Sequence, residues 1–168
     1  ERTAVVKTVK LTENAADEPV YASGAVYDND TAIASTDIEI EVVAFPELTL
    51  AKMRGDEVDE GGLILSGAGR PRPYFAYGKV VKMKNGKSRY EWYPKCKLSE
   101  NSDDVSTSEE KASEQNDTIK IKAYPFNDAG DIVARVSTDA GMPEGLTEEK
   151  FFVKPILTKE DLKTAVGV

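Results

Sequence analysis

Alternation of apolar and polar residues predicts β-strands in this chain. The clearest case is residues 36–45, where Ile38, Ile40 and Val42 alternate with acidic side chains. Such alternation is typical of a strand with one buried face and one face open to water. Further strands are expected over residues 4–11, 61–65, 118–124 and 131–137. Turn residues separate these segments, so the pattern predicts antiparallel pairing.

Helical signals are few and short. Pro46 suits the first position of a helix and Gly55 suits its end, so a helix is expected over residues 46–54. Residues 147–152 have the pattern of a capped helical turn, and the tail after Pro155 has a helical or extended pattern. The elements together predict a mainly β fold, a sandwich or open barrel of antiparallel strands with one flanking short α-helix. We expect one domain over residues 1–155 and a tail or arm over residues 156–168.

A hairpin is predicted over residues 79–97, because Asn85-Gly86 favours a two-residue type I′ turn. With the turn closed there, facing residues have numbers that sum to 171. Lys84 then faces Lys87, and Lys82 faces Arg89, while Lys79 lies opposite Trp92. The second strand is predicted to have one core face and one polar face. The core face comprises Ser88, Tyr90, Trp92, Pro94, Cys96 and Leu98. The polar face comprises Lys87, Arg89, Glu91, Tyr93, Lys95 and Lys97.

Like charges that face each other across a sheet are destabilising. Two interpretations of the basic face stay open at this point. In the first, it is a solvated sheet face that resists aggregation. In the second, an acidic surface of another molecule covers it.

Charge is segregated along the chain, although the net charge is −8. Residues 11–51 contain no Lys or Arg, the hairpin is basic, and residues 100–117 are acidic again. Patches of opposite sign on one molecule favour head-to-tail contact between copies. Nucleic acid is a weaker candidate for the basic face, because the chain is acidic overall and the hairpin aromatics are expected to face the core.

Residues for catalysis or metal binding are scarce. The chain has no His and one Cys, Cys96, which we expect to be a core residue. The acidic stretches at residues 28–30 and 56–60 lack the spacing of a calcium loop, and we interpret them as solvated turn carboxylates. We therefore expect no enzyme and no cofactor. No apolar run approaches the ~20 residues of a membrane span, so no membrane partner is expected either.

The segment "PYFAYGKVVKMKNGKSRYEWYPKCK" and its continuation to residue 126 resemble the central part of siphophage major tail proteins. These are the tail-tube subunits of phages of Gram-positive hosts, in which a Lys-rich hairpin joins two aromatic strands. The flanks are similar to that family as well: "YASGAVYDND", "PELTLAKMRGDEVDEGGLIL" and "VSTDAGMPEGLTEEKFFVKP". The resemblance covers residues 19–155. The residues that fit the central motif are Phe75, Tyr77, Gly78, Asn85, Gly86, Lys87, Tyr90, Trp92 and Tyr93.

The resemblance implies a β-sandwich that forms hexameric rings, which stack into the tail tube of the virion after assembly in the host cytoplasm. It implies as partners other copies of the chain, a tape-measure protein in the lumen, tail terminator and baseplate proteins, and genomic DNA in transit. An acidic wall would repel DNA over roughly one Debye length, ~8 Å, so we assign Asp37, Glu39 and Glu41 to the lumen or else to a solvated outer face. The candidate subunit interface comprises Lys82, Lys84, Lys87, Arg89, Lys95 and Lys97, together with the acidic loop 100–117.

A second class of function stays open, a monomeric β-sandwich that serves as a surface or carbohydrate-binding module. Such modules present aromatic side chains to solvent or hold a calcium ion beside the binding face. The predicted inward position of Trp92 and the carboxylate spacing count against this class. Self-association is the property that separates the two.

Overall fold

The computed structural model describes residues 6–22, 25–103 and 116–167, and the chain divides into two compact units. The first unit comprises residues 1–74 and 97–124, and the second comprises residues 75–96 and 125–168. Strand β6 contributes to both. The elements are β1 (Val6–Ala22), β2 (Ala25–Val42), α1 (Glu47–Arg54), β3 (Glu57–Val58), β4 (Ile64–Leu65), β5 (Phe75–Lys82), η1 (Lys84–Gly86), β6 (Ser88–Asp103), β7 (Asp117–Ala123), β8 (Ala134–Ser137), η2 (Thr138–Ala140), α2 (Glu148–Phe151) and α3 (Lys159–Val166).

In the first unit, β2 lies between β1 and β7 and is antiparallel to both. The alternation predicted for residues 36–45 is confirmed, because Ile38, Ile40 and Val42 are buried while Asp37 and Glu39 are exposed. Ile119 and Ile121 lie opposite Ile40 and Ile38 on β7 and are buried on the same face. This apolar face forms the core of the first unit.

The predicted helix is confirmed as α1, which supplies the buried residues Leu50 and Ala51. Pro46 stands immediately before its first residue, in extended geometry. Gly55 ends the helix in the left-handed conformation, and its backbone N–H bonds to carbonyls of the last turn. The separate β3–β4 hairpin follows directly after α1.

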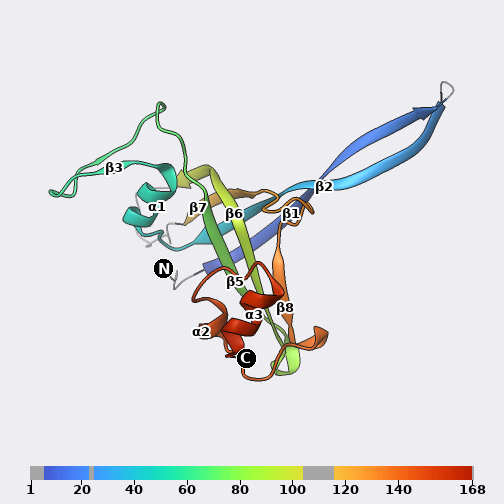
Figure 1. Cartoon of the computed structure of the whole chain (residues 1–168). Helices are drawn as coiled ribbons and strands as arrows, with labels where there is room; N and C mark the ends of the chain where they lie inside the picture. Colours follow the sequence, from blue (N-terminus) through green and yellow to red (C-terminus); the bar gives the residue numbers. More distant parts are fainter. Residues whose placement is uncertain (1–5, 23–24, 104–115, 168) are drawn as a thin grey trace, which may run out of the picture. The chain divides into compact units, whose positions relative to one another are not determined.

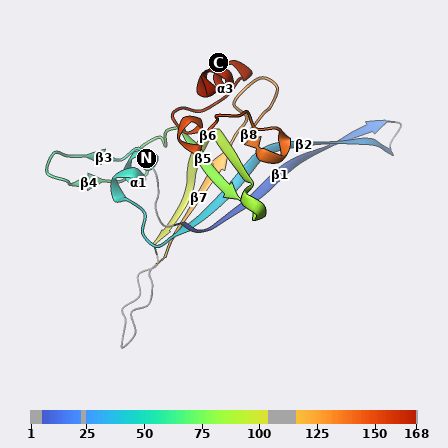
Figure 2. The ribbon, with the colours of Figure 1, turned by 90° about the horizontal axis from the view of Figure 1, so that it is seen from below.

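Strands β1 and β2 extend well beyond the predicted residues 4–11 and 36–45. They pair from Val6–Val42 as far as Ala22–Ala25. However, β7 pairs only with residues 36–42 of β2. The β1–β2 hairpin therefore continues as a two-stranded ribbon beyond the edge of β7, as the blue and cyan strands show (Figures 1 and 2).

In the second unit, β6 lies between β5 and β8, both antiparallel to it. One face carries a cluster of four buried residues: Tyr90, Leu146, Phe151 and Ile156. Trp92 packs beside them and donates a 3.0 Å hydrogen bond from Nε1 to the carbonyl oxygen of Phe151. Helix α2 is capped by Thr147, as the predicted helical turn requires.

A close approach explains the glycine that interrupts β5. A Cβ atom on Gly78 would lie 2.6 Å from the ring of Phe152 and 3.1 Å from Trp92. Because a side chain at this position would displace the Phe152 ring, Gly78 lets the aromatic layer lie directly on the strand.

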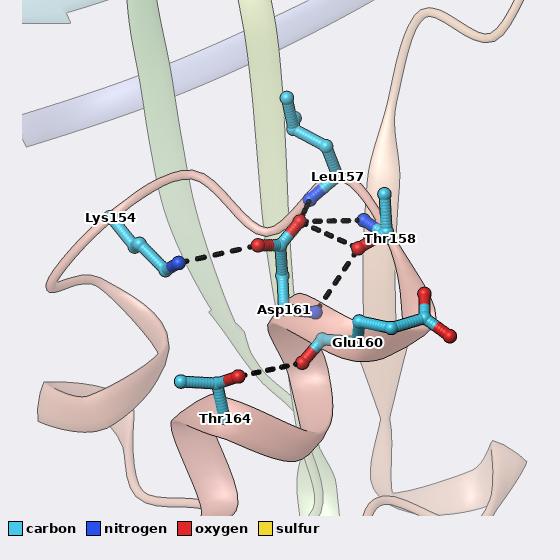
Figure 3. A network of polar contacts seen from close by, with 6 residues as sticks. All are labelled: Lys154, Leu157, Thr158, Glu160, Asp161 and Thr164. Carbon is cyan, nitrogen blue, oxygen red and sulfur yellow. Dashed lines mark hydrogen bonds and ion pairs between the residues drawn. The ribbon is translucent and has the colours of Figure 1, made fainter.

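The tail after Pro155 forms helix α3, whose apolar residues Leu162, Ala165 and Val166 pack against the same cluster. A capping box begins the helix: Thr158 Oγ1 accepts from the Asp161 N–H, and the Asp161 carboxylate accepts from the Thr158 N–H (Figure 3). The hydrogen bond from the Thr158 hydroxyl, then that from the Leu157 N–H and the Lys154 contact, lower the pKa of Asp161 to about 2. The prediction of an arm over residues 156–168 stays a prediction.

The mainly β fold class is confirmed, and its antiparallel strands are consistent with a sandwich or open barrel. The structure contains the short helices α2 and α3 in addition to α1, which was the one flanking helix expected. Both are short and lie in segments with only weak helical patterns. No helix in the described part of the chain has the length and apolar character to cross a membrane.

Candidate assembly surfaces

The turn of the β5–β6 hairpin differs from the predicted type I′ turn. Lys82 pairs with Ser88 and Val80 with Tyr90, so facing numbers sum to 170. The Met83 N–H donates to the Lys87 carbonyl over 2.8 Å and closes a three-residue loop, Lys84–Gly86. Gly86 has φ +73°, the left-handed residue that such loops need at their last position. Asn-Gly fits this loop as well as the shorter turn, which is why the prediction was wrong by one residue.

This shift replaces the predicted facing pairs. Lys82 faces Ser88 instead of Arg89, and Lys79 faces Glu91 instead of Trp92. No lysine of the hairpin therefore faces another basic residue across the β5–β6 pairs that the structure describes. The like-charge repulsion expected from the sequence is absent there.

A β-bulge further along β6 changes which residues share a face. Phe75 pairs with Cys96 and Tyr77 with Tyr93. The single residue between them on β5 therefore lies opposite two residues of β6. Tyr93 and Cys96 consequently lie on one face and are both buried. The side predicted to be polar therefore has its own buried core.

Glu91 is the centre of that core. The residue is only 1% exposed. Lys79 Nζ lies 3.0 Å from Oε2, and Arg89 Nε lies 2.6 Å from Oε1. The Tyr93 hydroxyl donates to Oε2 over 3.3 Å, and Arg135 of β8 is the cross-strand neighbour of Glu91. A buried carboxylate is tolerated when charges and hydrogen bonds compensate it in this way.

The environment of Glu91 also changes the acidity of its neighbours. Burial, followed by the charges of Cys96 and Glu91, raises the pKa of Tyr77 to about 12. Burial and Glu91 raise the pKa of Tyr93 well above its usual value, against a smaller opposite effect of Arg135. Burial raises the pKa of Cys96 to about 12, so this thiol is protonated at neutral pH, as expected for a core cysteine.

Sequence reasoning placed Glu91 on an exposed face and gave it no role. One feature of the sequence could have indicated a role for Glu91: it is the only acid among seven basic residues over residues 79–97. A lone acid within a basic strand pair is well placed to neutralise several cations at once. The correct register was needed to see this.

The structure brings only part of the predicted interface set together. Lys82, Lys84 and Lys87 are exposed at the tip of the hairpin, where Lys87 Nζ lies 2.5 Å from the Asp139 carboxylate. Arg89 is held by Glu91. Lys95 is half-buried at the bulge, and Lys97 belongs to the first unit, where its Nζ lies 4.3 Å from the ring centre of Tyr74. Of the acidic loop 100–117, residues 104–115 lie outside the described part of the chain.

A hollow of about 270 Å³ lies beside the hairpin tip. Val80, Met83 and Tyr90 give it an apolar lining, and Lys82 and Lys87 stand at it as well. Glu148, from the first turn of α2, brings one acid to the lining. We call residues 80–88 with this hollow the basic tip.

The predicted lumen residues Asp37, Glu39 and Glu41 lie together on the polar face of the first unit, but among basic residues. Glu39 stands between Lys10 and Lys120 on the neighbouring strands, and Asp37 pairs with Lys122. The face is of mixed sign rather than acidic. The assignment of these acids to a lumen stays a prediction.

Hydrogen bonds and ion pairs tie this polar face together. Asn14 donates to Asp37 over 2.7 Å, and Thr8 donates to Glu41 over 3.2 Å. Lys120 Nζ lies 2.9 Å from Glu100, whose hydrogen bond and charge raise the pKa of Lys120. The contacts lie at the surface, so each contributes little to stability.

The β3–β4 hairpin and its flanks, residues 56–66, form an acidic surface that also carries apolar side chains. Val58, Leu63 and Leu65 are 41%, 58% and 50% exposed. The acids are the ones interpreted from sequence as solvated turn carboxylates: Asp56, Glu57, Asp59 and Glu60. Arg70 lies 2.9 Å from Glu57, and the Ser66 hydroxyl donates to Asp56 over 2.5 Å. We call residues 56–66 the acidic hairpin.

Comparison with protein-family models and with curated proteins gives no match for this chain.

Proposed function

We propose that the chain is a structural subunit that assembles with copies of itself into the tail tube of a long, non-contractile phage tail. The rings would be hexameric and would stack around a tape-measure protein, between terminator and baseplate proteins, before DNA passes through. The resemblance over residues 19–155 suggests this role. A mainly β fold with antiparallel strands and a short flanking helix is compatible with it.

The observation that carries the proposal is the β1–β2 ribbon. Beyond Thr36 of β2, towards the turn, the two strands pair with each other and β7 does not follow them. A two-stranded hairpin is marginally stable by itself in water. Strand β1 is also an edge strand in the sheet order of the described residues. The backbone N–H and C=O groups on its outer side therefore face away from the sheet. A ribbon and an edge of this kind favour pairing with another chain.

Exposed apolar side chains supply a second line of support. Leu63 beside β4 is 58% exposed, and Val58 and Leu65 accompany it on the acidic hairpin, while Leu48 of α1 is also 58% exposed. Exposed apolar groups that gather on one element indicate an interaction site. The acidic hairpin and the basic tip are also separate segments of the chain. The exposed apolar groups and this separation of charge favour contact between different surfaces of two copies.

The mixed charge of the polar face refines the lumen proposal. A wall that alternates Asp37 and Glu39 with Lys10, Lys120 and Lys122 attracts DNA less than a basic wall would. Such a face suits a channel that must let DNA move. We retain Asp37, Glu39 and Glu41 as the candidates for the lumen side.

Electron microscopy of the purified protein at rising concentration tests the proposal. We expect rings or hollow tubes, and we expect fewer and shorter tubes for a variant with Lys82→Gln, Lys84→Gln and Lys87→Gln. Arg89 is left unchanged because it neutralises Glu91. A control variant replaces the exposed Lys159, Lys163 and Lys150 by Gln, which removes the same number of charges, and should assemble normally. A wild-type protein that stays monomeric at every concentration would favour the surface-module class.

A further inference from the structure

We propose that the acidic hairpin of one copy docks on the basic tip of a second copy, with Leu63 inserted into the hollow of the tip. This inference rests on the proposed self-assembly and names the two surfaces that meet. It is carried by three properties of the two surfaces: exposed apolar side chains, opposite charge and the volume of the hollow.

The acidic hairpin has little structural support of its own. Its strands are two residues each and form a sheet separate from the main one. Val58, Leu63 and Leu65 stay largely in water. An isolated hairpin gains stability when a partner covers its apolar side chains. The element therefore has the composition of a binding surface.

The charges on the acidic hairpin differ in how far they are already compensated. Glu57 is paired with Arg70, and Asp56 accepts the Ser66 hydroxyl. Asp59 and Glu60 are exposed at the turn, where the Gly62 N–H closes the loop on the Asp59 carbonyl. These two carboxylates stand three and four residues before Leu63. An apolar side chain is thus flanked by two exposed negative charges.

The basic tip is complementary in charge. Arg89 and Lys87 are engaged with Glu91 and Asp139. Lys82 and Lys84 are exposed on either side of the half-buried Met83. Two exposed cations on the tip thus correspond to two exposed carboxylates on the hairpin. Steering of this kind sets the register of an interface and speeds its formation.

The volume of the hollow agrees as well. The hollow of about 270 Å³ is lined by Val80, Met83 and Tyr90. An apolar cavity of about 150 Å³ holds benzene, and a leucine side chain has fewer carbon atoms than benzene. Glu148 is the acid in the lining, and it is outnumbered there by Lys82 and Lys87. The side chain of Leu63 fits this space.

A second copy of the chain is the occupant that the charges favour, because each copy carries both surfaces. The contact joins two different surfaces, and when each copy binds the next in this head-to-tail way it generates a ring or a filament. This is the mode of association that a stacked tube requires.

Charge reversal tests the contact by sedimentation equilibrium. One variant carries Asp59→Lys and Glu60→Lys, and the other carries Lys82→Glu and Lys84→Glu. We expect each variant alone to self-associate at least tenfold more weakly than wild type, because like charges then meet across the contact. An equimolar mixture should regain association, since the reversed tip of one variant matches the reversed hairpin of the other.

A control for the first variant carries Asp128→Lys and Glu144→Lys, the same change in net charge as that variant, at two exposed sites of the second unit. It should associate like wild type. Unchanged association of both test variants would overturn the docking, and so would a mixture that fails to recover. If both test variants still form tubes under the electron microscope, the docking is wrong and the tube proposal stands. If wild type forms neither tubes nor oligomers, both are wrong.

Discussion

The two compact units place their charged residues in opposite settings. In the second unit, Glu91 is buried between strands and is neutralised by Lys79 and Arg89. In the first unit, Asp37 and Glu39 alternate with lysines on an open sheet face. Both units place acids within β-strands opposite bases. Burial, rather than the identity of the residues, decides what each pair contributes.

The same contrast holds for the apolar residues. The second unit covers β6 on both faces, with Tyr90 in the aromatic cluster on one side and Glu91 and Tyr93 on the other. The first unit leaves Leu63 and Leu65 in water and lets the β1–β2 ribbon extend past β7. We infer that the second unit is stable mainly through its own packing, while the ribbon and the acidic hairpin of the first unit are candidate assembly surfaces, as is the basic tip of the second unit.

The largest effect is expected from Glu91→Ala. The change leaves Lys79 without its buried counter-charge, and breaking a buried pair in this way costs about 3–5 kcal/mol. Urea unfolding followed by the fluorescence of Trp92, the single tryptophan, measures the free energy of unfolding in the same unit.

Glu100→Ala is the matched control, since Glu100 lies 2.9 Å from a lysine nitrogen, close to the 3.0 Å between Glu91 and Lys79, but at the surface. This substitution should lower the free energy of unfolding by no more than about 1 kcal/mol. Urea unfolding followed by circular dichroism measures this change. Equal losses in the two variants would contradict the distinction between buried and exposed pairs.

A smaller loss is expected from Gly78→Ala, which tests the aromatic layer of the second unit. The added methyl would meet the Phe152 ring at 2.6 Å and force it to move. Overpacking of this kind typically costs about 1–3 kcal/mol. Gly67→Ala is the control in the first unit, because a Cβ there meets nothing within 4 Å. Its effect should stay within about 0.5 kcal/mol, and a neutral Gly78→Ala variant would show that Phe152 adapts freely.

Local patterns in the sequence were sufficient for the elements that are decided locally. Alternation located Ile38 and Ile40 in a half-buried strand, and Pro46 with Gly55 located α1. The full length of the β1–β2 ribbon was not predictable in this way. Its residues beyond Thr36 lack clear alternation, and they pair with each other without the third strand that would bury one face.

The candidate surfaces depended on a register that the sequence left ambiguous. Asn85-Gly86 is compatible with a two-residue and a three-residue loop, and the difference of one residue decides which side chain faces Lys79. The bulge that brings Tyr93 and Cys96 to one face has no local signature. Glu91 was therefore placed on the polar outer face of the hairpin, although it is buried and compensated by Lys79 and Arg89.

The smallest effect is expected on the open face, from Asp37→Asn combined with Glu39→Gln. Both acids are exposed, and their partners Lys120 and Lys122 are only partly buried at the surface, where such pairs contribute only tenths of a kcal/mol. The free energy of unfolding should change by less than about 1 kcal/mol, and added salt should reduce the difference further. Circular dichroism at low and high salt measures this. A loss as large as that of Glu91→Ala would mean that this face is covered within the protein, and it would remove the face from the candidates for a solvent-filled lumen.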